Sequence, residues 1–129
     1  MNRLAMPWRV GAVVLAGLLA CGLPLWPIPY REVSMPENPS GTLWLLGASV
    51  SGLLAGFLLR PGLRAPVLSV VAGFVLAVVG RVAVETSSDP TSHNLWPFEV
   101  VIAGGFGLAG ALLGVGTARL AQRLGRAAS

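Results

Sequence analysis

The residues best suited to chemistry lie in one short polar segment between residues 89 and 99. It holds two carboxylates, the chain's single histidine, an amide and a tryptophan: Asp89, Glu99, His93, Asn94 and Trp96. A histidine beside carboxylates can bind a divalent metal or act as an acid–base pair. We therefore treat these five residues as a candidate recognition site.

The same residues also have a structural interpretation, which the sequence favours. One histidine and two carboxylates lack the spacing of a metal-ligand set. Asp89 and Asn94 are typical of turns and caps, and Glu99 suits the first turn of a helix, where the helix dipole stabilises an anion. We predict no catalytic residue, no metal and no cofactor. An enzyme that uses the loop around His93 is the third of three functional hypotheses.

Four long apolar segments flank and position the polar ones. Only 11% of the residues are charged, against about 25% in soluble domains, and each apolar segment approaches the ~20 residues of a spanning helix. The sequence predicts an all-α integral membrane protein, a four-helix bundle in which residues 1–129 form one domain. The expected spans are about 8–26, 42–60, 66–85 and 97–118, and the outer loops are 27–41 and 86–96.

The charged residues sort by sign between the two sides of this bundle. Most arginines flank the first span, separate the second from the third, or follow the fourth: Arg3, Arg9, Arg60, Arg64, Arg119, Arg123 and Arg126. All five acids lie in the other two connections: Glu32, Glu37, Glu85, Asp89 and Glu99. Arginine-rich loops stay cytoplasmic, so we predict cytoplasmic termini and two outer loops. The arginines sit at membrane borders, which argues against a nucleic-acid partner, and we expect the inner membrane of a bacterium.

Small residues recur at spacings of three or four residues along the apolar segments. In lipid, helices associate by close backbone approach at such stripes. The predicted helix-packing interface consists of Ala48, Gly52, Gly56, Gly107, Gly110 and Gly114. We expect the partners to be the lipid bilayer and either other transmembrane subunits or copies of this chain. The first hypothesis is therefore a non-catalytic accessory or structural subunit of a larger membrane complex, and the alternative is a homo-oligomeric channel or transporter component.

Several border residues have expected structural roles. Trp44 is predicted to anchor the outer membrane interface, and Arg81 to extend outward from its helix while pairing with Glu85 four residues on. Cys21 is expected to be a small packing residue in the first helix. No ionisable side chain lies near the centre of any span, whereas proton relays and ion-coupled carriers normally need one.

Overall fold

The computed structural model describes residues 6–29, 32–33, 37, 40–59, 62–88 and 96–129. Within these residues the chain forms four α-helices: α1 (Met6–Leu25), α2 (Gly41–Leu58), α3 (Arg64–Ser88) and α4 (Trp96–Ala128). All four are long and apolar enough to cross a membrane. The prediction of an all-helical, multi-pass membrane protein is confirmed at this level.

Proline and glycine mark the helix ends. Pro24 lies in the last turn of α1 and Pro27 follows the helix, and proline cannot continue a helical hydrogen-bond pattern. The turn between α2 and α3 contains Gly62 with φ of +89°, a left-handed conformation that side chains rarely adopt. Pro66 and Pro97 lie in the first turns of α3 and α4, where proline's missing N–H costs little.

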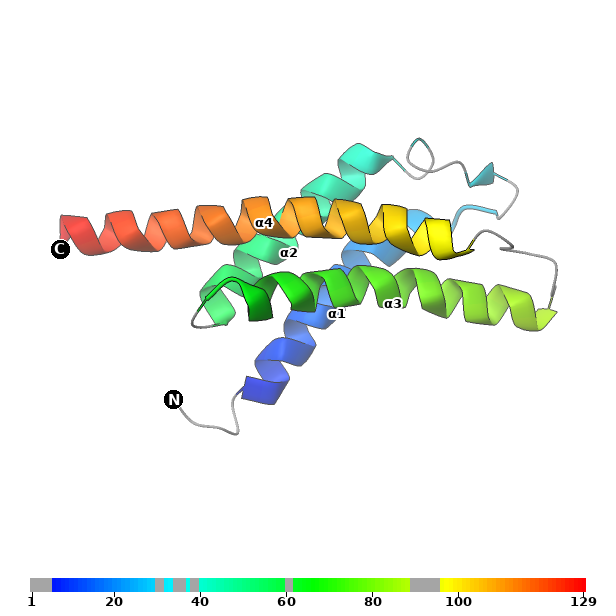
Figure 1. The fold of residues 1–129 in the computed structure, drawn as a ribbon, viewed down its shortest axis with the longest axis horizontal. Helices are drawn as coiled ribbons and strands as arrows, with labels where there is room; N and C mark the ends of the chain where they lie inside the picture. Colours follow the sequence, from blue (N-terminus) through cyan, green and yellow to red (C-terminus); the bar gives the residue numbers. More distant parts are fainter. Residues whose placement is uncertain (1–5, 30–31, 34–36, 38–39, 60–61, 89–95) are drawn as a thin grey trace.

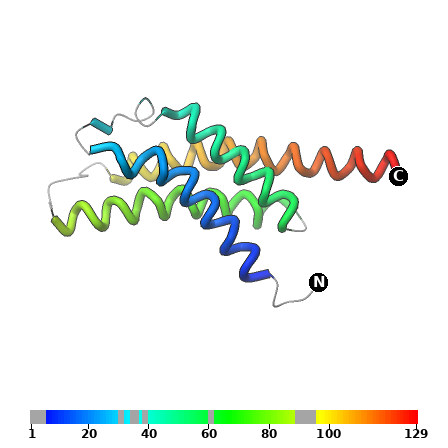
Figure 2. The backbone as a smooth tube through the Cα atoms, turned by 180° about the vertical axis from the view of Figure 1, so that it is seen from behind, coloured from blue at the N-terminus to red at the C-terminus, as the bar shows by residue number. Residues whose placement is uncertain are grey.

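The four helices form two antiparallel hairpins, α1–α2 and α3–α4, that cross each other at an angle (Figures 1 and 2). The closest packing is between hairpins: α2 packs most extensively against α4, and α1 against α3. In both of these pairs the two helices run in the same direction (Figure 1). The fold is thus built from two close parallel pairs, each made of one helix from each hairpin.

Three aromatic rings from three helices meet inside the bundle. Trp44 of α2 meets Phe74 of α3 and Phe106 of α4 edge to face, with ring centroids 6.3 and 6.0 Å apart. Trp44 is fully buried, and its Nε1 donates to the carbonyl oxygen of Cys21 at 3.1 Å. The prediction that Trp44 anchors the membrane interface is wrong, because its indole joins α2 to α1 inside the bundle. Cys21 is buried in α1, where its small side chain packs in the core.

Helix α4 is much longer than a bilayer requires. Its 33 residues extend about 50 Å at ~1.5 Å per residue, whereas a hydrocarbon core is about 30 Å thick. The last turns, which carry Arg119, Arg123 and Arg126, continue past the turn between α2 and α3 (Figure 1). The start of α1 and the end of α4 lie toward this same end of the bundle (Figure 2).

Candidate functional site at the two arginine-capped ends

The predicted recognition loop is described only in part. Asp89, His93 and Asn94 lie outside the described residues, so their proposed roles stay predictions. Trp96 is the first residue of α4 and about half exposed, and Glu99 lies half-buried in the first turn of that helix. Glu99 therefore occupies the position at which the dipole of α4 favours an anion.

The six residues predicted as a helix-packing interface all lie buried within this chain: Ala48, Gly52, Gly56, Gly107, Gly110 and Gly114. A Cβ added at Gly52 would lie 2.7 Å from the carbonyl oxygen of Ala111, and one at Gly107 would lie 2.9 Å from the ring of Phe74. The stripe therefore brings α4 close to α2 and α3 of the same chain. Contact with another chain stays a prediction, and it requires residues outside this buried set.

At the end of α1, a buried arginine of α3 binds the carbonyl oxygens that the helix leaves free. Arg81 donates from Nη1 to the carbonyl oxygen of Leu25 at 2.5 Å and from Nη2 to that of Ile28. Its Nε donates to Oε1 of Glu85 at 2.8 Å, which forms the predicted ion pair. The prediction that Arg81 extends outward is wrong: the residue is 7% exposed, because it turns inward to cap α1.

Trp26 adds a second link at this end. Its Nε1 donates to the carbonyl oxygen of Ala77 at 3.2 Å, so the turn after α1 is held on α3 by two side chains. A shallow cavity of about 410 Å³ lies beside Trp26, Gly80, Arg81 and Glu85. The charge of Arg81 is already matched by Glu85. The polar groups at this end of the bundle therefore bind one another and leave no unmatched charge on Arg81.

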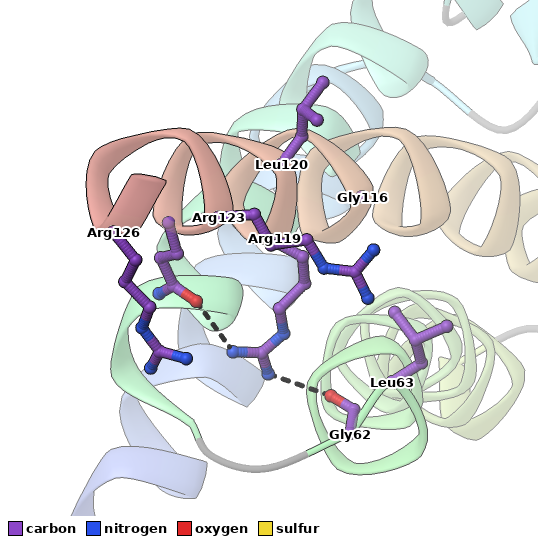
Figure 3. Close-up of a pocket in the computed structure, with 8 residues that line it drawn as sticks. Gly62, Leu63, Gly116, Arg119, Leu120, Arg123 and Arg126 are labelled. Carbon is purple, nitrogen blue, oxygen red and sulfur yellow. Dashed lines mark hydrogen bonds between the residues drawn. The ribbon is translucent and has the colours of Figure 1, made fainter. Parts of the chain in front are cut away.

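At the end of α2, Arg119 of α4 plays the corresponding part. Its Nη1 donates to the carbonyl oxygen of Gly56 at 3.0 Å, and its Nη2 to those of Leu59 at 2.9 Å and Gly62 at 2.8 Å. Gln122 accepts from Arg119 and donates to Gly56 as well. Figure 3 shows the guanidinium between the last turns of α4 and the Gly62 turn. Arg119 thus satisfies the carbonyls that α2 cannot satisfy alone.

A larger cavity, of about 580 Å³, opens beside this second cap. It is lined by polar side chains of α4 and by apolar residues of both walls: Arg119, Gln122, Arg123, Arg126, Leu63 and Leu120, with Gly62 and Gly116. Arg119, Arg123 and Arg126 all extend from α4 to the side that faces the Gly62–Leu63 turn (Figure 3). Their spacing of four and three residues places them on one helix face.

The chemistry available at this cavity is the binding of an anion. Guanidinium groups only donate hydrogen bonds and stay charged at any physiological pH. Among the described residues no group of three or more His, Cys, Asp or Glu side chains gathers in a way that could hold a metal ion. The site is therefore a positively charged recess at the edge of the apolar part of the bundle.

Sequence reasoning treated these arginines as lipid-facing border residues and missed both caps. One signal was present: each helix, α1 and α2, ends without a basic residue of its own in the last turn. A distant arginine therefore has carbonyls to bind, but the sequence does not say which one reaches them. No protein-family model matches this chain, and comparison with curated proteins and with solved structures finds no match either.

Proposed function

We propose that this protein is a non-catalytic accessory subunit that packs one face of α4 against a transmembrane helix of another polypeptide. The observation that carries the proposal is a group of small residues on α4 that no described part of the chain covers. A Cβ added at Gly105 or Gly116 would have no atom within 4 Å, and Ala109 between them is exposed. Gly105, Ala109 and Gly116 lie on one face of a helix of 3.6 residues per turn, a face that also carries the exposed Leu112.

The physical reason is the cost of glycine in a helix. Glycine is less favourable than alanine by roughly 1 kcal/mol at an interior helical position. At Gly52 and Gly114 close contact with another helix of the chain explains that cost, because no side chain fits there. Gly105 and Gly116 have no such explanation within the described residues. Close approach of a helix from outside would supply one.

The hydroxyl groups of the apolar helices support a non-catalytic role. Ser49, Ser69 and Thr117 each donate to the carbonyl oxygen four residues earlier in their own helix, at 2.7, 2.6 and 2.7 Å. These side chains therefore satisfy their hydrogen bonds locally instead of lining a polar path through the bundle. In the proposed orientation both termini are cytoplasmic and the acidic connections lie outside, because arginine-rich segments stay inside.

The test is the composition of the complex extracted from native membranes in a mild detergent. Native mass measurement should show this chain bound to a second polypeptide. Gly105→Leu combined with Ala109→Leu should release that polypeptide, because two leucines would fill the open face of α4. Ala72→Leu is the control, since it adds a leucine at an exposed position of α3, away from this face of α4.

Two outcomes would count against the proposal. A lone chain in the parent protein would remove the partner altogether, and retention of the partner by the double variant would exclude this face of α4. A complex that contains only copies of this chain would instead favour the second function, a homo-oligomeric channel or transporter component.

A further inference from the structure

Arginines gather, without acidic side chains among the described residues, at the end of the bundle that carries the Arg119 cap. Among the described residues this end holds five arginines: Arg9, Arg64, Arg119, Arg123 and Arg126. The described carboxylates belong to the opposite end, in the connection between α1 and α2, the last turns of α3 and the first turn of α4: Glu32, Glu37, Glu85 and Glu99. The described part of the chain therefore offers no acidic side chain at this end.

The three arginines of the cavity do not have equal roles. Arg119 is held by three carbonyl oxygens and by Gln122, so its position is fixed by the fold. The side chains of Arg123 and Arg126 are exposed, and within the described residues neither has a hydrogen-bond acceptor or an ion-pair partner. Two forked donors are thus available to an external group on the same side of α4 (Figure 3).

The other walls of the cavity are apolar. Leu63 comes from the turn before α3, and Leu120 lies one residue after Arg119 on α4. The recess is about 580 Å³ in volume and lies where α4 leaves the apolar part of the bundle. A ligand that fits must carry a compact anion for the guanidinium groups and an apolar portion for the leucines.

We propose that this cavity binds the phosphate of an anionic phospholipid, with the first part of the lipid chains against Leu63 and Leu120. A guanidinium matches a phosphate with two parallel hydrogen bonds. Arginines near an anionic headgroup add attraction that falls off with distance from the surface. The cavity opens at the border of the membrane-spanning region, where phospholipid headgroups lie, so a lipid reaches it without leaving the bilayer. This inference goes beyond the proposed subunit role, and its test involves no partner chain.

The experiment is a lipid titration of the full-length chain in a neutral detergent, followed by native mass spectrometry at constant salt. Phosphatidylglycerol should bind more tightly than phosphatidylcholine of the same chain length. Each of Arg123→Gln and Arg126→Gln should weaken phosphatidylglycerol binding roughly fivefold, and the double variant roughly thirtyfold. Both side chains are exposed, so the melting temperature should stay within about 2 °C of the parent.

The matched control is Arg64→Gln, because Arg64 is an exposed arginine at the same end that does not line the cavity. It should change binding by less than about twofold, since water and salt screen it from the ligand. An equal loss from Arg64→Gln and Arg123→Gln would overturn the proposal in favour of general surface attraction. Inorganic phosphate is the soluble alternative: equally tight binding of phosphate alone, or equal binding of the two lipids, would also overturn it.

Discussion

In each of the two close helix pairs of this protein, an arginine of one helix caps the end of the other. The two caps lie at opposite ends of the bundle, and their surroundings differ. In the α1·α3 pair, Arg81 of α3 binds carbonyl oxygens at the end of α1. In the α2·α4 pair, Arg119 of α4 binds carbonyl oxygens at the end of α2. Arg81 is buried and paired with Glu85, whereas Arg119 is half-buried, binds no carboxylate in the described structure, and has two further arginines beside it.

The difference separates what an arginine does for the fold from what it leaves for other molecules. A buried arginine needs both its hydrogen bonds and a counter-charge, because removing charge from water is costly. Arg81 has both within the chain. At the other end the capping bonds are complete, but no acidic side chain among the described residues matches the charge of Arg119. The end of the bundle with the Arg81 cap is therefore structural. The end with the Arg119 cap is the one suited to a ligand.

The largest expected effect tests the close approach within the α2·α4 pair. A Cβ at Gly114 would collide with backbone atoms of α2 at Ser49, Gly52 and Leu53, and backbone cannot move aside as a flexible side chain can. Gly114→Leu should lower the free energy of unfolding by more than about 3 kcal/mol. The measurement is equilibrium unfolding by sodium dodecyl sulfate in mixed micelles.

Gly105→Leu on the same helix is the control, because its Cβ meets no atom within 4 Å. It should raise the stability of the isolated chain by roughly 0.5–1 kcal/mol, since leucine favours a helix more than glycine does and meets no neighbour there. A similar loss in both variants would mean that glycine itself, and not close helix packing, accounts for the effect.

The second prediction compares the two caps directly. Arg81→Met should lower the free energy of unfolding by about 3 kcal/mol, since it removes the ion pair with Glu85 and leaves two carbonyl oxygens, one of them buried, without their donor. Arg119→Met should cost about 1.5 kcal/mol, because water can reach the carbonyls that it frees. The same unfolding titration measures both.

A further variant separates the two interactions of the Arg81 cap, its ion pair and its bonds to carbonyl oxygens. Glu85→Gln should destabilise the protein less than Arg81→Met, because the side chain of Glu85 is 30% exposed and Arg81 keeps its two carbonyl acceptors. If Arg119→Met lowered the free energy of unfolding more than Arg81→Met, the Arg119 cap would be the more structural of the two, and the comparison above would be wrong.

The smallest effect concerns the link between the pairs. Trp44→Phe keeps an aromatic ring beside Phe74 but removes the hydrogen bond from Nε1 to the carbonyl oxygen of Cys21. It should cost about 1 kcal/mol. Trp96→Phe, at an exposed residue at the start of α4, should change stability by less than about 0.5 kcal/mol. Equal values for the two tryptophans would contradict the central role of Trp44.

Much of the fold could be predicted from local pattern. Apolar length predicted four helices, and Pro24, Gly62 and Pro97 lie at helix ends because their backbone restrictions act within a few residues. The ion pair between Arg81 and Glu85 was also predictable, since both belong to one helix face. Asp89, His93 and Asn94 lie outside the described residues, so the chemistry suggested for that loop stays a prediction.

The residues that were predicted wrongly are those whose partners come from a distant helix. Trp44 and Arg81 belong to types that favour membrane borders, and composition alone assigns them there. The structure instead turns both inward to bind carbonyl oxygens of α1. The role of Arg119 could not be predicted for the same reason, because its acceptors lie 57, 60 and 63 residues away in the sequence.

By itself the sequence determined that this is a protein of four apolar helices with most of its arginines and all of its acids in different connections, because both properties depend on residue type and spacing along one chain. Only the tertiary structure decided which helices pair and which glycines pack against another helix. It also decided which arginines bind the carbonyl oxygens at helix ends. Those outcomes depend on contacts between helices, and a stripe of small residues does not specify its neighbour.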